Sequence, residues 1–250
     1  CQLPIDLKRV TDTLSNLGQS PNVGAALIVS LGCEGTDHER MVEEIRAAGK
    51  PVEIIRIQEL GGTSRAIQAG IDAAQRLVQE ISGLQRETVD ISEVVMAIKC
   101  GASDTTSGMA SNCVIGYVAD KLVDLGATVV FGETTEFLGG EHILAKRAVG
   151  GENGPIGQKI YEIVDRMEKR AKSVGEDMRG GQPTPGNIAG GLSSIEEKSL
   201  GAIVKSGHRP IQGVLEYCDR VDGQKGLWIK DAPGREPEIL TGMAATGAQF

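Results

Sequence analysis

The sequence has 250 residues, of which 40% are hydrophobic, 24% are charged and only 3% are aromatic, and its formal net charge is −8. This balance suits one large or two modest globular domains with an aliphatic core, and the acidic charge argues against a nucleic-acid groove. The sequence contains no secretory signal, 18-residue apolar run or lipidation motif, and its five cysteines lack disulfide-type spacing. We therefore expect a cytoplasmic protein with no membrane or nucleic-acid partner.

Four short apolar runs rich in Val, Ile, Leu and Ala are typical of buried parallel strands. They are Ala25–Leu31, Val52–Ile57, Val94–Ile98 and Ala127–Phe131. Helical spacing of apolar residues lies between them, over Thr36–Ala48, Thr63–Ile81 and Ser107–Leu125. In Thr63–Ile81 the repeated apolar residues are Ile67, Ile71, Ala74 and Val78. This alternation predicts an α/β fold with a parallel, doubly wound, Rossmann-like sheet covered on both faces.

The composition changes after Arg170, and residues 173–191 are rich in Gly and Pro, which predicts a long loop. Ser194 and Glu197 have capping-box spacing, so a helix is expected to begin there. Two short strand candidates follow, at Gly213–Tyr217 and Gly226–Ile229. The predicted organisation is an α/β domain over 1–172, a loop over 173–191 and a smaller α/β C-terminal portion over 192–250.

The ends of the predicted strands carry the residues suited to chemistry. In open α/β sheets the ligand crevice lies beyond the carboxyl ends of the strands. The four loops at these ends combine glycines with thiols, carboxylates or hydroxyls: Gly32–Gly35, Gln58–Thr63, Lys99–Asp104 and Gly132–Glu136. We expect all four to meet in one crevice. In addition, Asn187–Gly191 leads into the helix expected near Ser194, where free N–H groups could bind a substrate carboxylate.

Several stretches resemble the altronate/galactarate dehydratase family, which includes the sulfolactate sulfo-lyase large subunit. They are Gly32–Glu34, Lys99–Gly108, Gly132–Phe137, Gly139–His142 and Gly186–Lys198. The resemblance runs in order from Cys1 to the end of the chain. Gly132–His142 is more similar to the sulfo-lyase and Gly32–Glu34 to the sugar-acid dehydratases, so the substrate stays open.

The resemblance implies an iron-dependent lyase that eliminates water across the Cα–Cβ bond beside a carboxylate, with a sugar acid such as altronate or galactarate as substrate. It also implies a small N-terminal domain or partner subunit and further sequence at the other end. The start at Cys1 without Met, and the Ala/Gly-rich end, agree with a central piece that could be inactive alone. A homo-oligomer stays open.

The chemistry itself requires charge stabilisation. A proton α to a carboxylate is removed only when a cation holds the enediolate charge, and a Lewis acid helps the β-hydroxyl leave. A side-chain acid or base completes the transfer. Two alternatives remain: a sulfolactate-type sulfo-lyase that releases sulfite, and a non-catalytic sugar-acid-binding module that holds no metal.

Cys100, Cys33 and His142 are the candidate metal ligands, for Fe²⁺ or for an iron–sulfur cluster in which Cys1 could be a third thiol. Cys100 is otherwise explained as a small buried hydrophobe, and His142 as a surface histidine near a helix start. We interpret Cys113 as structural.

The candidate catalytic residues are His142, Glu133 and Lys198, with Glu136 as a second carboxylate beside Glu133. The candidates for binding the substrate hydroxyls and carboxylate are Ser103, Asp104, Ser107, Asn112, Thr134, Arg147 and Asn187. Ser107 could instead be only a helix N-cap. The basic candidates for the carboxylate (Lys99, Arg147 and Lys198) could instead be solvated side chains.

Overall fold

The computed structural model describes residues 3–250 and divides into two compact units. The first unit contains the chain up to Val89 together with Ala244–Gln249, and the second contains Asp90–Met243 together with Phe250. Both units have parallel strands and packed helices, which confirms the predicted α/β class. None of the described helices is both long and apolar enough to cross a membrane.

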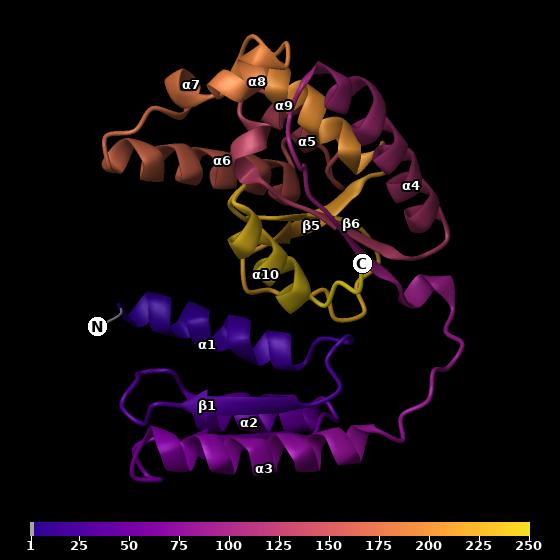
Figure 1. Ribbon diagram of the computed structural model, residues 1–250. Coiled ribbons are helices and arrows are strands. Elements are labelled where there is room, and N and C mark those ends of the chain that lie inside the picture. The colour runs from indigo at the N-terminus through magenta and orange to yellow at the C-terminus, as the bar shows by residue number, and fades with distance from the viewer. Residues whose placement is uncertain (1–2) are drawn as a thin grey trace. The chain divides into compact units, whose positions relative to one another are not determined.

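The first unit is built on two parallel strands, β1 (Ala26–Ser30) and β2 (Val52–Arg56). Its helices are α1 (Pro4–Gly18), α2 (His38–Ala47) and α3 (Thr63–Ile81), all seen in the indigo-to-purple part of Figure 1. Helix α2 begins at an N-cap, where the Asp37 side chain accepts the N–H of Arg40. Its residues Val42 and Ile45 pack against the two strands and form the core of this unit.

The face that α3 buries differs from the predicted one. Ala66, Ala73 and Leu77 are buried, whereas Ile67, Ile71 and Val78 of the expected apolar stripe are exposed. The helix lies close to the strands because, apart from Leu77, the buried stripe is made of alanines. A Cβ added at the neighbouring Gly70 would stand 3.2 Å from Ile55 Cδ1. A prediction from hydrophobicity alone assigns the larger apolar side chains to the buried face. Close packing of a helix on a sheet instead requires small side chains between them.

The second unit has a four-stranded parallel sheet in the order β3-β4-β6-β5. The strands are β3 (Val95–Ile98), β4 (Thr128–Phe131), β5 (Ile211–Leu215) and β6 (Gly226–Lys230). The prediction that the first four strands of the chain share one sheet is therefore wrong, since β1 and β2 form a separate sheet. Periodicity identifies a strand but not its partner.

Helices cover both faces of this larger sheet, as predicted. Val129 and Phe131 of β4 face the main core, where α4 (Asn112–Asp124) and α6 (Pro155–Ser173) pack, whereas Val130 faces Ile239 and Met243 of α10 (Glu236–Thr246). Figure 1 shows α10 on one side of this sheet and α4, α6, α5 (Glu141–Lys146) and α9 (Ile195–Ile203) on the other.

The C-terminal third of the chain completes the second unit. Strand β6 pairs with β4, so the predicted C-terminal portion shares the sheet of the preceding residues. The stretch predicted as a Gly/Pro-rich loop contains two short helices, α7 (Met178–Gly181) and α8 (Pro185–Ala189). Helix α9 begins where the capping box predicts, with Ser194 Oγ accepting the Glu197 N–H.

Candidate functional site

A cavity of about 370 Å³ lies at the carboxyl ends of β3 and β4 in the second unit. We call it the strand-end cavity. Its walls come from the loops after these two strands, from the segment between α6 and α9, and from the first turns of α9 and α10 with the loop before α10. Two of the four predicted loops, Lys99–Asp104 and Gly132–Glu136, therefore meet as expected. The other two, Gly32–Gly35 and Gln58–Thr63, belong to the first unit.

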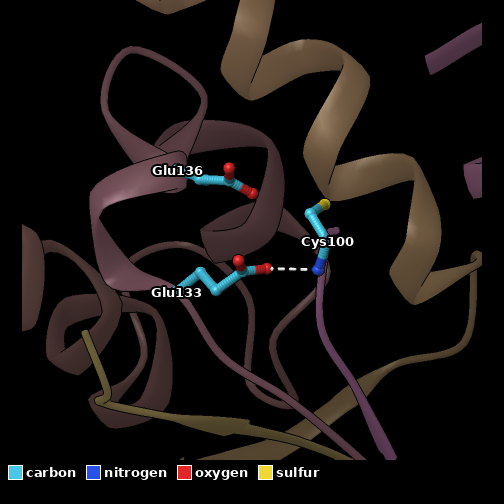
Figure 2. Close-up of side chains that lie close together, drawn as sticks. All are labelled: Cys100, Glu133 and Glu136. Atoms are coloured by element: carbon cyan, nitrogen blue, oxygen red, sulfur yellow. Dashed lines mark hydrogen bonds between the residues drawn. The ribbon is translucent and has the colours of Figure 1, made fainter. Parts of the chain in front are cut away.

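Glu133 occupies a special backbone position directly after β4. Its φ of 71° makes it the one non-glycine residue with positive φ between residues 3 and 250. Such a conformation costs free energy and recurs at functional sites. The Glu133 side chain is only 2% exposed, and its Oε2 accepts the backbone N–H of Cys100 at 2.7 Å. This bond, drawn in Figure 2, joins the ends of β3 and β4.

Cys100, Glu133 and Glu136 form a buried group that we call the carboxylate–thiol cluster. Figure 2 shows the side chains of Glu133 and Glu136 directed toward Cys100. The amine of Lys205 joins this group: Nζ lies 3.0 Å from Cys100 Sγ and donates hydrogen bonds to Glu133 Oε2 and, at 3.3 Å, to Glu136 Oε2. Lys205 is 1% exposed and lies in η4 (Val204–Ser206), the turn that follows α9.

Sequence reasoning missed Lys205. A signal was present, because this lysine interrupts the otherwise apolar and small stretch from Ala202 to Gly207. A charged side chain in such a stretch is buried only when it is paired. The pattern alone does not name the partners.

Lys205 and the three side chains of the carboxylate–thiol cluster shift one another's pKa. Burial raises the pKa of Glu133, an effect that nearby Lys205 only partly offsets. For Glu136 burial acts in the same direction, but Lys205, Cys100 and Lys198 together outweigh it and the net effect lowers the pKa. Burial acts to lower the pKa of Lys205, yet the carboxylates of Glu136 and Glu133 outweigh it and raise the pKa. The cluster therefore favours an ammonium, an ionised Glu136 and a Glu133 that retains a proton more readily than an ordinary glutamate.

The carboxylate–thiol cluster has the spacing of a metal site but not the protonation state of one. It is the one group of three Cys, His, Asp or Glu residues in the described chain whose ligand atoms lie within 4.8 Å of one another. However, the Lys205 ammonium binds all three side chains, and burial raises the pKa of the Cys100 thiol to about 12. A metal ligand must be deprotonated, and a dication would need the ammonium to leave. As packed, these residues do not fit an iron ion.

The other predicted metal ligands lie elsewhere. Cys33 is exposed in the loop after β1 of the first unit, where Gln58 Nε2 donates to its Sγ at 3.5 Å. His142 is exposed on α5 and does not line the strand-end cavity. Neither belongs to a three-ligand group within the part of the chain that the structure describes. Cys1 lies outside the described residues.

Lys198, Asn187 and Ser103, three of the candidate site residues, line the strand-end cavity. Lys198 Nζ donates to Gln182 Oε1 at 2.9 Å and lies 3.7 Å from Glu136 Oε1. Asn187 Nδ2 donates to the Ser103 carbonyl at 2.8 Å, which ties α8 to the loop after β3. These contacts place a cation and two hydrogen-bonding side chains beside the carboxylate–thiol cluster.

Lys99 is a second lysine of the cavity wall. Its Nζ lies 2.5 Å from Glu236 Oε1 and 3.9 Å from Glu133 Oε1. The cavity therefore has an ammonium group close to each of its two buried carboxylates, in addition to Lys205.

The other residues predicted to bind substrate make hydrogen bonds within the protein and do not line the cavity. Asn112 contacts the cluster: its Nδ2 donates to the Gly201 carbonyl at 2.8 Å and lies 3.9 Å from Cys100 Sγ. Asp104 Oδ1 accepts the Ser107 N–H at 2.7 Å, a local cap. Thr134 and Arg147 fasten neighbouring segments to one another. Thr134 Oγ1 donates to Asp231 at 2.6 Å, and Arg147 donates to Ser206 Oγ at 2.9 Å.

Comparison with known proteins gives the same division into two units. Residues 1–82 match the second domain of D-galactarate dehydratase/altronate hydrolase, and residues 91–250 match the C-terminal domain of D-galactarate/altronate dehydratase. The boundary between the two units, between Val89 and Asp90, falls in the short stretch that separates the two matched ranges. The change of composition after Arg170 coincides instead with the end of α6, inside the second unit.

Three relatives show how far the similarity reaches. The (2R)-sulfolactate sulfo-lyase subunit beta of Chromohalobacter salexigens is 40% identical over 98% of this chain and 62% of its own length. Altronate dehydratase of Bacillus subtilis is 32% identical over 100% of this chain and 49% of its own length. Galactarate dehydratase (L-threo-forming) of Escherichia coli is 34% identical over 94% and 45%. The chain thus spans between 45% and 62% of the length of these relatives. By its two matching domains, the chain belongs to the D-galactarate/altronate dehydratase family.

Proposed function

We propose that the strand-end cavity is a lyase active site that eliminates water from a hydroxylated carboxylic acid, with sugar acids as the substrate class. The observation that carries the proposal is Glu133, a buried carboxyl held in a left-handed backbone conformation at the cavity wall. The names of the relatives, which are dehydratases and a sulfo-lyase subunit, support a lyase.

The lysines of the cavity would bind the substrate carboxylate. Removal of the α-proton leaves negative charge on the carboxylate oxygens, and a nearby ammonium stabilises this charge most when water is excluded. Lys198 lines the cavity from α9, and Lys99 lines it from the residue after β3. Asn187 and Ser103 would hydrogen-bond the hydroxyl groups of the same molecule.

Glu136 and Glu133 would move the protons. Two carboxyl groups with pKa values displaced in opposite directions suit a base and an acid, respectively. Glu136, with the lowered pKa, takes the α-proton; the bond from Cβ to its hydroxyl breaks; and Glu133 donates its proton to the leaving oxygen, which departs as water. The remaining enol becomes a 2-keto acid by proton transfer. No step of this proposal uses the expected iron, because Lys205 fills the carboxylate–thiol cluster.

Release of sulfite from a sulfonated hydroxy acid is the second candidate. It is favoured by the 40% identity to the sulfo-lyase subunit and by a third basic residue of the cavity, Arg235, in addition to Lys99 and Lys198. A sulfonate beside a carboxylate needs this additional positive charge. The same base would remove the α-proton, and sulfite would leave in place of water.

We also propose that the complete enzyme includes a further segment or subunit. The relatives are longer than this chain, and the name of the sulfo-lyase relative describes one subunit. The test is an assay with altronate, galactarate and sulfolactate, using the chain alone and combined with such a segment. Formation of a 2-keto acid supports dehydration, and sulfite formation supports the second candidate.

Two variants make this test specific. Glu133→Gln and Glu136→Gln should each lower kcat by about 10²-fold or more, the usual contribution of a general acid or base. The exposed Glu162→Gln on α6 is the matched control. Binding of these acids without turnover under any of these conditions would instead favour the non-catalytic binding module.

A further inference from the structure

We infer that Lys205 supplies, from within the fold, the positive charge that Cys100, Glu133 and Glu136 would otherwise take from a divalent metal ion, and that it positions both carboxylates. The statement about charge stands on the geometry of the cluster alone. The statement about positioning rests on the proposed function. Lys205 does not line the strand-end cavity and would act through the two glutamates that do.

The hydrogen-bond count of the ammonium supports this inference. A lysine ammonium has three N–H groups and no acceptor. Lys205 Nζ meets three acceptors: Glu133 Oε2, Glu136 Oε2 at 3.3 Å and Cys100 Sγ at 3.0 Å. Its hydrogen-bonding capacity is therefore used by the three side chains that have the spacing of a metal site.

The burial of the charged groups also supports the assignment of Lys205 as the cation of the cluster. Glu133 and Glu136 are 2% and 7% exposed, so neither can rely on water to stabilise a negative charge. Lys205 is 1% exposed and is equally dependent on them. Removal of one partner of a buried ion pair leaves an uncompensated charge. We therefore expect a protein without the Lys205 amine to bind another cation between Cys100, Glu133 and Glu136.

The backbone around Lys205 is anchored on both sides. Gly116 of α4 lets η4 approach, since a Cβ there would stand 2.3 Å from the Val204 carbonyl oxygen. Arg147 donates to the Ser206 hydroxyl at 2.9 Å. Gly207, with φ +62°, turns the chain immediately afterwards. These contacts hold the residues on either side of Lys205.

Titration with Co²⁺ tests the charge statement without any assay of activity. Cobalt bound to a thiolate gives a charge-transfer band in the near ultraviolet. The unaltered protein should give no such band from Cys100, whereas Lys205→Ala should give one, and Lys205→Ala combined with Cys100→Ser should lose it. A band from the unaltered protein that Cys100→Ser removes would overturn the inference, and so would a folded Lys205→Ala protein without a band.

Kinetics of the active assembly test the positioning statement. Lys205→Met should lower kcat about 100-fold, the usual cost of a misplaced catalytic group, with KM changed less than about threefold. Lys205→Met and Glu133→Gln together should cost less than the product of the two single effects, because both disturb one unit. Unchanged kcat in Lys205→Met, or fully multiplicative effects, would contradict positioning.

Lys230→Met is the matched control for both tests. Lys230 is a second fully buried lysine of the same unit, 0% exposed, and its Nζ donates to the carbonyls of Glu216 and Asp219. It should give neither the cobalt band nor the loss of kcat. If no acid is turned over at all, the proposed function fails, but the cobalt titration still decides the charge statement. Should Lys205→Ala fail to fold, the titration of the unaltered protein against Cys100→Ser decides it.

Discussion

Gly116 of α4 and Val204 of η4 approach so closely that a Cβ at position 116 would stand 2.3 Å from the Val204 carbonyl oxygen. The neighbouring atoms are backbone, so they cannot move away as a flexible side chain would. Gly116→Ala should therefore lower the free energy of unfolding by about 1–3 kcal/mol, the usual cost of overpacking. Urea denaturation measures this. Gly83→Ala, where no atom lies within 4 Å of the added Cβ, should change it little.

The left-handed backbone of Glu133 predicts a difference between two substitutions that both remove its carboxylate. Glu133→Gly should be more stable than Glu133→Ala by about 1 kcal/mol, because only glycine adopts positive φ without steric cost. Denaturation of the two variants side by side gives the difference. Equal stability, or a more stable alanine variant, would show that Glu133 is unstrained in the native protein.

Asp120 of α4 should make stability depend on pH. Burial acts to raise the pKa of Asp120, but hydrogen bonds from His208 and from the N–H of Arg209 outweigh it and lower the pKa. A lowered pKa means that Asp120 stabilises the fold above its unfolded-state pKa, near 3.9, and that this stabilisation is lost as the pH falls through the folded-state value. Asp120→Asn should therefore be less stable than the unaltered protein at pH 7, with a difference that narrows toward pH 3.

The measurement is chemical denaturation over a pH series. Asp72→Asn, on the exposed side of α3, is the control and should show no comparable effect. A destabilisation by Asp120→Asn that stays constant between pH 7 and pH 3 would contradict the assigned role of the Asp120 charge.

Lys198 should contribute to binding more than to turnover. If it holds the substrate carboxylate, Lys198→Ala removes a charge-assisted hydrogen bond, and KM should rise by about 10- to 100-fold. Steady-state kinetics with the active substrate measure this. Lys169→Ala is the control, since Lys169 is exposed on α6 and paired with Asp165, and KM should not change. An unchanged KM in Lys198→Ala would exclude Lys198 from the carboxylate site.

Truncation of a side chain should destabilise the protein on the buried stripe of α3 but hardly at all on the exposed stripe. Leu77 is 6% exposed, and Leu77→Ala should destabilise the protein by about 2–4 kcal/mol through the cavity that it leaves. Ile67 is 58% exposed, and Ile67→Ala should change stability by less than about 0.5 kcal/mol. A large loss in Ile67→Ala would mean that the predicted stripe is buried after all.

Local pattern in the sequence was sufficient for most elements and for part of the site. Strand β4, predicted as Ala127–Phe131, is Thr128–Phe131 in the structure, and α9 begins at its predicted capping box. Cys100, Ser103 and Glu133 line one cavity, as expected of loops at the carboxyl ends of parallel strands. Asn187 of α8 and Lys198 of α9 line the same cavity. These features depend on neighbours in the chain and on a general rule of sheet geometry.

Only the tertiary structure decided which strands share a sheet and which cation stands among the buried acids. Thr128 of β4 pairs with Gly226 of β6, and Lys205 reaches Glu133 from far along the chain. No local pattern encodes such a pairing, because it is set by how whole layers pack. The sequence by itself determined the parallel α/β elements and the polar strand ends, since hydrophobic periodicity and capping act over a few residues. Packing decided that a lysine ammonium lies among the carboxylates and the thiol, since a buried charge is stable only where distant segments bring its partners together.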